Sequence, residues 1–365
     1  MNLLSLQAMP PLRFGGGILI LVVTWLTSTV VRAECRIDRS TASAAETFTL
    51  HLSRDCTEAE RDARAVPAQD IMRALMQGKG VDLAGVVVRG DLFLDDIPVV
   101  NLDSLKGLPE EDRQVVEAKK GEELHLVQGP FVVTRSRVEG RIVNRLKGGY
   151  LAIAGPVVLA ETQFLGPLDL SRSIFLGLVD MSRSKFEAES FFVQSRFTQG
   201  AMFTDVRFGP HARFHRARFN GPADFRGASF SGLSEFLEVV FRQKADFSRV
   251  TFHMGTGFSG TKCLDTCDFS EAQFQREAFF LFTRFEGPGR FASAHFHAAA
   301  DFTDSEFKIE DDLAQASYAQ PPMLTRAKRL TTTVPGRVAA PFSQVVTIGL
   351  LLAASALLLY VIRSR

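Results

Sequence analysis

Four histidines of this 365-residue sequence are spaced so that their imidazoles could come together for metal binding or proton transfer. His211 and His215 flank Phe214, and His253 and His297 fall in equivalent places of a repeat described below. A surface metal site or an acid–base pair is the functional interpretation. We favour the structural one, in which these histidines lie on an outward, solvated surface.

Three aspartates, Asp224, Asp246 and Asp268, recur every 22 residues and would form a ladder along one side of a repetitive fold. Paired carboxylates can carry out acid–base catalysis, so the nature of the repeat decides their role. The sequence contains no glycine-rich phosphate loop, nucleophile elbow or zinc-protease helix. We therefore predict no catalytic, cofactor or metal site.

Four cysteines form two close pairs along the chain, Cys35 with Cys56 and Cys263 with Cys267. A bridge between Cys35 and Cys56 is the preferred pairing, because it would clip a short N-terminal segment that has few other anchors. Cys263 and Cys267 fall inside the repeat, where a bridge and a pair of buried thiols are equally open. A zinc site is disfavoured, since it would need further ligands at a suitable spacing.

Basic side chains recur every 11 residues in the middle of the sequence. They are Lys185, Arg196, Arg207 and Arg218, with Arg213 and Arg216 close by. They predict basic rows on the surface, for which an anionic partner such as an envelope polymer or a lipid head group is the functional hypothesis and ordinary solvated charge the alternative. The 42 Lys and Arg nearly balance 41 Asp and Glu, so the total charge does not favour a nucleic-acid partner.

Phenylalanine dominates the aromatic composition, with 32 Phe against three Tyr and one Trp. Most of these Phe fall in one register that steps alternately by 6 and 5 residues from Phe164 to Phe307. The register has 27 centres, 24 of them Phe, and the other three are Leu170, Met181 and Cys263. A small residue stands two positions before each centre, with Leu168 as the large exception. This pattern indicates a dry, repetitive interior.

The alternating steps exclude straight elements. On an α-helix, steps of 5 and 6 residues turn by about 140° and 240°, and on a straight strand a step of 5 reverses the face. A chain that turns a corner after each unit keeps every centre inside. We therefore predict a parallel β-solenoid with four units, or 22 residues, per coil. Its length from Phe164 to Phe307 would be roughly six and a half coils, or about 31 Å.

The repeat units resemble those of the pentapeptide repeat family. Residues 223–230, 245–248 and 300–303 are similar to its A(D/N)LXX unit in a Phe-centred form, and the resemblance covers residues 164–307. It implies an all-β fold, a right-handed quadrilateral parallel β-helix with the Phe and the preceding small residue inside. It also implies that Asp224, Asp246 and Asp268 support the corner backbone. The inserted residue in alternate units departs from the family pattern, and the family's roles are too diverse to transfer.

The regions around the Phe-centred repeat, residues 161–308, complete the predicted organisation. Residues 81–160 form irregular first coils, with a charged surface insertion at 101–124. Residues 34–80 form a small helical N-terminal cap from 57–64 and 67–77, since an open solenoid end has to be covered. Residues 309–342 form a C-terminal cap and linker. The candidate inward positions of the first coils are Val132, Val138, Val143, Ile153 and Val158.

Both ends of the sequence carry apolar segments typical of membrane passage. Residues 1–33 read as a signal peptide with a small-residue cleavage site after Ala33, and an uncleaved anchor is the alternative. Residues 343–362 predict one transmembrane helix, because 345–362 are uncharged and long enough to cross most of a bilayer core. The expected location is a bacterial-type cell membrane, with residues 363–365 as a cytoplasmic tail and the body extracytoplasmic, either periplasmic or at the cell surface.

The leading functional hypothesis is a non-enzymatic, membrane-tethered scaffold or protein-binding module. Phe279 and Phe282 lie outside the inward register and, with Leu281 beside them, form the candidate partner patch. Phe191 also lies outside the register. The expected partners are the membrane and an unidentified protein, not nucleic acid. The alternative is a small-ligand sensor or enzyme that uses residues 81–150.

Overall fold

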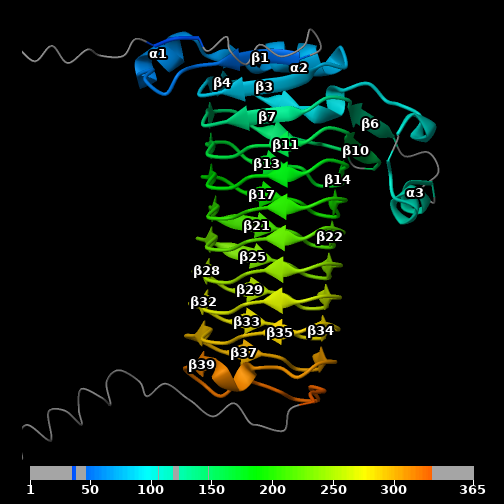
Figure 1. The fold of residues 1–365 in the computed structure, drawn as a ribbon, viewed down its shortest axis with the longest axis vertical. Coiled ribbons are helices and arrows are strands. Elements are labelled where there is room, and N and C mark those ends of the chain that lie inside the picture. The colour runs from blue at the N-terminus through cyan, green and yellow to red at the C-terminus, as the bar shows by residue number, and fades with distance from the viewer. Residues whose placement is uncertain (1–34, 38–46, 106, 118–122, 147, 331–365) are drawn as a thin grey trace, which may run out of the picture. The chain divides into compact units, whose positions relative to one another are not determined.

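Four parallel β-sheets form a solenoid in the computed structural model, which describes residues 35–37, 47–105, 107–117, 123–146 and 148–330 (Figure 1). The chain enters sheets I, II, III and IV in turn. Each strand pairs with the strand one coil further on, as Gln163 does with Lys185. The prediction of an all-β parallel solenoid with four sides is thereby confirmed. Among the described residues no helix is long and apolar enough to cross a membrane. The predicted segments 1–33, 343–362 and 363–365 lie outside them.

Each sheet is a stack of short strands, and neighbours in the stack pair with each other. Sheet I contains β1 Thr47–His51, β3 Gly80–Ala84, β7 Phe131–Thr134, β11 Val157–Val158, β15 Val179–Asp180, β19 Ala201–Met202, β23 Ala223–Asp224, β27 Ala245–Asp246, β31 Cys267–Asp268 and β35 Gly289–Arg290. Sheet II contains β2 Val66–Pro67, β4 Val87–Arg89, β8 Arg137–Val138, β12 Gln163–Phe164, β16 Lys185–Phe186, β20 Arg207–Phe208, β24 Ser229–Phe230, β28 Thr251–Phe252, β32 Gln273–Phe274, β36 His295–Phe296 and β39 Ser317–Tyr318. Sheet III contains β5 Leu92–Phe93, β9 Ile142–Val143, β13 Leu168–Asp169, β17 Ser190–Phe191, β21 His211–Arg213, β25 Leu233–Glu235, β29 Thr256–Gly257, β33 Ala278–Phe279 and β37 Ala300–Asp301. Sheet IV contains β6 Leu124–Val127, β10 Tyr150–Ile153, β14 Ser173–Phe175, β18 Arg196–Phe197, β22 Arg218–Phe219, β26 Val240–Phe241, β30 Lys262–Cys263, β34 Arg284–Phe285 and β38 Glu306–Phe307.

Ladders of stacked side chains fill the interior, one ladder for each sheet. All 27 predicted centres are buried, and none is more than 3% exposed. Rings stack on the next coil within a ladder, as Phe197 does on Phe219 with ring centroids 4.4 Å apart. The ladders of sheets I and III meet edge to face, as Phe225 and Phe214 do at 5.5 Å and 87°. Both arrangements suit the quadrupole of an aromatic ring, and Phe has no polar group that would need a partner inside.

Two kinds of corner explain the alternating steps between residues 161 and 308. The 5-residue step leads from sheet I to II or from III to IV, and its corner contains a residue with positive φ, such as Arg183 at 58° or Arg216 at 56°. The 6-residue step leads from II to III or from IV to I, and no residue there has a positive φ. The inserted residue therefore replaces a left-handed backbone turn, which L-residues adopt only at a cost.

The inward positions of the first coils differ in part from the prediction. On sheets I and III two inward residues flank one outward residue, as Val157 and Leu159 flank Val158. A shift of one position along a strand moves every side chain to the other face. The predicted positions Val138 and Ile153 on sheets II and IV are buried, whereas Val132, Val143 and Val158 on sheets I and III are half-buried outward residues.

Helices close the N-terminal end of the solenoid. Helix α1, Glu58–Ala63, begins at Thr57, which forms a capping box with Glu60. Helix α2, Ala68–Met76, lies across the first coil (Figure 1) and buries Ile71 and Leu75 against it. Gly78, at φ 74°, follows as a left-handed stop. Residues 34–80 also supply β1 and β2, the first strands of sheets I and II.

The C-terminal end is closed by the short helix η3, Leu313–Gln315, and by β39. Tyr318 stacks on Phe296 with ring centroids 5.0 Å apart and so ends the sheet II ladder. Its hydroxyl donates a hydrogen bond to the Leu313 carbonyl at 3.1 Å. A tyrosine can end the ladder because its polar group finds this partner in η3.

An insertion between β5 and β6 covers the outer face of the first strands of sheet IV. It contains η1 Leu94–Asp96, η2 Leu102–Ser104 and α3 Glu110–Glu117. Leu105 and Leu108 of the insertion pack with Tyr150, Ile174 and Leu176 in a second buried cluster. The predicted surface excursion at 101–124 is therefore packed onto the solenoid by its apolar side chains.

Candidate functional site

One outward side chain from each coil forms a row on the outer face of sheet IV. From β14 to β38 this sheet IV row reads Ile174, Arg196, Arg218, Val240, Lys262, Arg284 and Glu306. Each of these residues directly precedes an inward centre, so its side chain points the other way. The row is basic in its middle, with neighbours about 4.8 Å apart along the stack.

Acidic residues of α3 meet one basic residue of this sheet and another in the corner that follows it. The carboxylate of Asp112 accepts a hydrogen bond from Arg196, and the two side chains are only 2% and 8% exposed. Asn220 donates to the other Asp112 oxygen at 3.4 Å, and Glu111 pairs with Arg242. Arg196, predicted as part of an exposed basic surface, is instead buried next to α3, because a carboxylate there compensates its charge.

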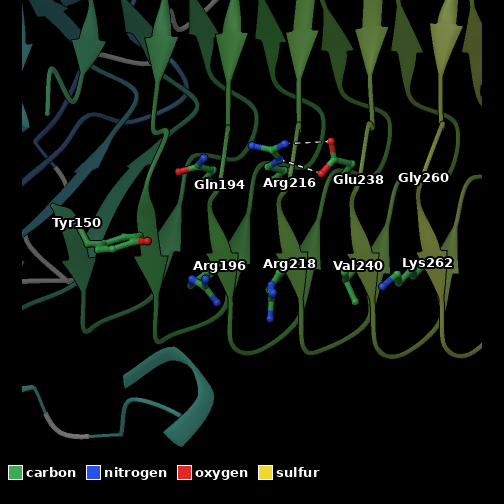
Figure 2. Close-up of a pocket in the computed structure, with 9 residues that line it drawn as sticks. All are labelled: Tyr150, Gln194, Arg196, Arg216, Arg218, Glu238, Val240, Gly260 and Lys262. Carbon is green, nitrogen blue, oxygen red and sulfur yellow. Dashed lines mark hydrogen bonds and ion pairs between the residues drawn. The ribbon is translucent and has the colours of Figure 1, made fainter. Parts of the chain in front are cut away.

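From Arg196 to Lys262 the sheet IV row borders a depression of about 410 Å³. Figure 2 shows Arg218, Val240 and Lys262 on one side of it, with Tyr150 at the N-terminal end. The other side is the corner between sheets III and IV, where Arg216 donates to Glu238 at 2.9 Å. That hydrogen bond holds the pKa of Glu238 below its ordinary value. With more cations than anions among its lining residues, the depression can bind a negatively charged group.

The basic residues predicted by the 11-residue spacing do not share one surface. Eleven residues are half a coil, so Lys185 and Arg207 lie on sheet II while Arg196 and Arg218 lie on sheet IV. Lys185 pairs with Glu187 at 2.6 Å. Lys262 and Tyr150 were not among the predicted site residues, although Lys262 lies two 22-residue periods after Arg218.

An apolar surface lies on sheet III and its following corner. Phe279 and Phe282 are 40% and 64% exposed, and Leu281 between them is half-buried. These three residues are the sheet III patch. In the preceding coil, Gly257 pairs with Phe279 and Gly260 donates its N–H to the Leu281 carbonyl. Neither glycine has a side chain that could cover the ring in the next coil, and Leu237 lies beside Gly257.

Phe282 also occupies an unfavourable backbone conformation, with φ at 55°. Bulky residues rarely adopt the left-handed region, which costs roughly 1–2 kcal/mol for an L-residue. The equivalent corner positions between sheets III and IV hold polar residues or glycine, namely Arg172, Gln194, Arg216, Glu238, Gly260 and Asp304. Phe282 therefore combines a strained backbone with an exposed ring. Phe191, in contrast, lies under the guanidinium of Arg213, 5.7 Å from the ring centroid.

Both cysteine pairs form disulfides. The bridge between Cys35 and Cys56 confirms the preferred pairing. Cys263 and Cys267, for which two states were open, are also bridged, across the corner from sheet IV to sheet I. Cys263 takes the place of a ring in the sheet IV ladder. In the described part of the chain no cysteine is free, and no cluster of His, Cys, Asp and Glu could hold a metal ion.

The four histidines considered as a metal or acid–base site lie apart, and each has different neighbours. His253 lies 3.1 Å from the Ser229 hydroxyl, His297 lies 3.2 Å from the Gln273 side chain, and His211 lies 3.5 Å from Glu235. The backbone carbonyl of His215 accepts a hydrogen bond from the Gln194 N–H at 2.8 Å, and its imidazole has no hydrogen bond to another residue in the described part of the chain. No hydrogen bond or ring contact joins two of these four imidazoles in the described part of the chain, so the less favoured interpretation, an acid–base pair, has no geometry to support it.

The aspartate ladder lies on the outer face of sheet I, where Asp246 pairs in register with both Asp224 and Asp268. Each carboxylate accepts a hydrogen bond from the backbone N–H two residues on, at 3.0 Å in all three cases. Burial raises the pKa of Asp246, but hydrogen bonds from Lys244 and Ser248 outweigh it and lower the pKa overall. The ladder thus supports the corner backbone, as the resemblance implied.

Comparison with known proteins agrees with this geometry. The sequence model of the family described as "Pentapeptide repeats (9 copies)" matches residues 170–218 and 214–262. These residues lie in the middle of the ring ladders. No curated protein and no solved structure matches the chain.

Proposed function

We propose that this pentapeptide-repeat solenoid is a non-enzymatic scaffold that binds a protein partner through the sheet III patch. The regular coils place outward side chains at fixed intervals of about 4.8 Å, which suits recognition of a surface. The interior is filled by stacked rings, and the conspicuous outward features are charges and the patch.

The observation that carries this proposal is Phe282, whose ring is 64% exposed while its backbone is left-handed. Strained residues of this kind are retained where they serve a function. Phe279 adds a second exposed ring on the same sheet, and aromatic side chains are enriched at the centres of protein interfaces. Burial of both rings by a partner would recover the free energy that their exposure costs.

The proposal places the solenoid on the extracytoplasmic side of a bacterial-type cell membrane, tethered through residues 343–362. The apolar runs at 14–31 and 345–362 of the sequence support this placement. Two disulfides support it as well, because such bonds persist in oxidising compartments and are rare in the cytosol.

Site-specific photocrosslinking tests the binding surface. A benzoyl-phenylalanine at position 282 is expected to give a covalent adduct with one defined protein, and Phe279→Ser is expected to remove that adduct. The matched control carries the crosslinker at Leu264, which is 43% exposed at the corner between sheets IV and I. The same adduct from both positions, or none from position 282, would contradict the proposal.

Thiol labelling tests the topology separately. The four native cysteines are bridged, so Thr332→Cys supplies a reactive thiol in the linker. An impermeant maleimide is expected to label it in intact cells, while Ser364→Cys in the predicted tail reacts only after lysis. Labelling of Thr332→Cys only after lysis would refute an extracytoplasmic solenoid.

A further inference from the structure

Within the sheet IV row, the first and the last basic residue are paired with carboxylates, whereas the two basic residues between them are not. At one end Asp112 of α3 pairs with Arg196. At the other, Arg284 lies 3.2 Å from Glu306. Between them Arg218 and Lys262 have no ion-pair partner among the residues that the structure describes. A pair of uncompensated cations therefore remains at the depression.

The neighbourhood of these two cations does not neutralise them. Arg216 across the depression is already paired with Glu238. Val240 stands between Arg218 and Lys262 in the row, so the two cations are two coils, or about 9.6 Å, apart. Val240 adds apolar contact area between them, whereas Tyr150 at the N-terminal end of the depression is buried. The site thus combines two positive charges with an apolar surface between them (Figure 2).

Sheet IV and the corner that follows it already bind carboxylates that a helix carries. Asp112 and Glu111 of α3 reach Arg196 and Arg242, which lie on coils two apart. This intramolecular contact shows which chemistry the sheet IV surface accepts: acidic side chains of a polypeptide, presented from a helix. Glutamates seven residues apart on a helix are about 10.5 Å apart along its axis, close to the separation of Arg218 and Lys262.

We propose that Arg218 and Lys262 bind an acidic helical segment of a partner protein, one carboxylate at each cation and an apolar side chain on Val240. This inference rests on the proposed function in that the partner is a protein, but it uses a different sheet from the sheet III patch. Charge-assisted hydrogen bonds to Arg and Lys would supply specificity for carboxylates at this spacing.

The test measures the affinity of the full chain in detergent for a fluorescent, alanine-based helical peptide with two glutamates seven residues apart and a leucine midway. Arg218→Ala with Lys262→Ala is expected to weaken binding at least tenfold. Arg207→Ala with Arg276→Ala removes the same charge from two exposed arginines on other faces and is expected to change it less than twofold. Unchanged urea midpoints establish that each variant is folded.

Three further outcomes decide the inference. A peptide with glutamine in place of glutamate is expected not to bind. Equal weakening by both double variants would overturn the site in favour of bulk charge, and binding of inorganic polyphosphate but not of the peptide would overturn the choice of partner. Phe279→Ser with Phe282→Ser is expected to leave peptide binding unchanged. This variant therefore distinguishes failure of the binding proposed for the sheet III patch from failure of the site at Arg218 and Lys262.

Discussion

The carboxylate of Asp112 in α3 accepts a hydrogen bond from the guanidinium of Arg196 in β18, and both side chains are almost completely buried. The two residues are 84 positions apart in the sequence. Their contact joins the insertion to the stack of coils and decides how much of the sheet IV row is left open. A buried charge without a counter-ion is energetically costly. The ion pair therefore holds α3 in its position on the solenoid.

Asp112→Ala is expected to lower the free energy of unfolding by on the order of 3 kcal/mol, because Arg196 would be left buried without its counter-ion. Hydrogen exchange at the amides of α3 should accelerate, since release of the helix lets water reach the guanidinium. The matched control is Glu111→Ala, whose pair with Arg242 is exposed and should be worth less than about 1 kcal/mol. Equal losses in the two variants, by urea denaturation, would show that the buried pair does not hold α3.

Phe225→Ala is expected to destabilise the solenoid by about 3–5 kcal/mol, because a fully buried ring leaves a cavity between its stacked neighbours. Phe225→Asp should prevent cooperative folding, since its charge would have no partner inside. Phe279→Ala removes the same ring from a position that is 40% exposed and should lower the free energy of unfolding by less than half as much. Comparable urea midpoints for Phe225→Ala and Phe279→Ala would be inconsistent with the ring ladders.

The spacing of the rings was sufficient to predict the fold, because burial of a centre every 5 or 6 residues leaves few geometries other than a four-sided coil. The outer surface was less predictable. The recurrence of Lys185, Arg196, Arg207 and Arg218 at 11 residues spans half a coil, so these residues lie alternately on sheets II and IV. The contact of Asp112 with Arg196 follows no period, so only the folded chain reveals which of the basic residues stay open.

Acid should weaken the solenoid in part through the aspartate ladder. The pKa of Asp246 is lowered in the folded state from its ordinary value of 3.8. As the pH falls, this carboxylate is therefore protonated in the unfolded chain before it is protonated in the folded one. Stability from this group is present above that pH and is lost as the pH falls through the lower, folded pKa. Asp246→Asn keeps an oxygen that can accept from the Ser248 N–H but cannot ionise. Urea midpoints between pH 7 and 3 should therefore fall less in Asp246→Asn than in wild type, and parallel curves would show that the carboxylate is not linked to folding.

Phe282 is expected to be a site where stability and binding conflict. Phe282→Gly should raise the free energy of unfolding by about 0.5–1 kcal/mol, because glycine adopts φ near 55° without strain and this gain exceeds its greater freedom in the unfolded chain. The same substitution should abolish partner binding by removing the most exposed ring of the sheet III patch.

Gly260→Ala, at φ 72° in the preceding coil, is the converse control and should lower stability by about 1 kcal/mol. Urea denaturation and copurification of the crosslinked partner measure the two effects. A Phe282→Gly variant that is no more stable, or that keeps its partner, would remove the reason to connect the strain at this corner with recognition.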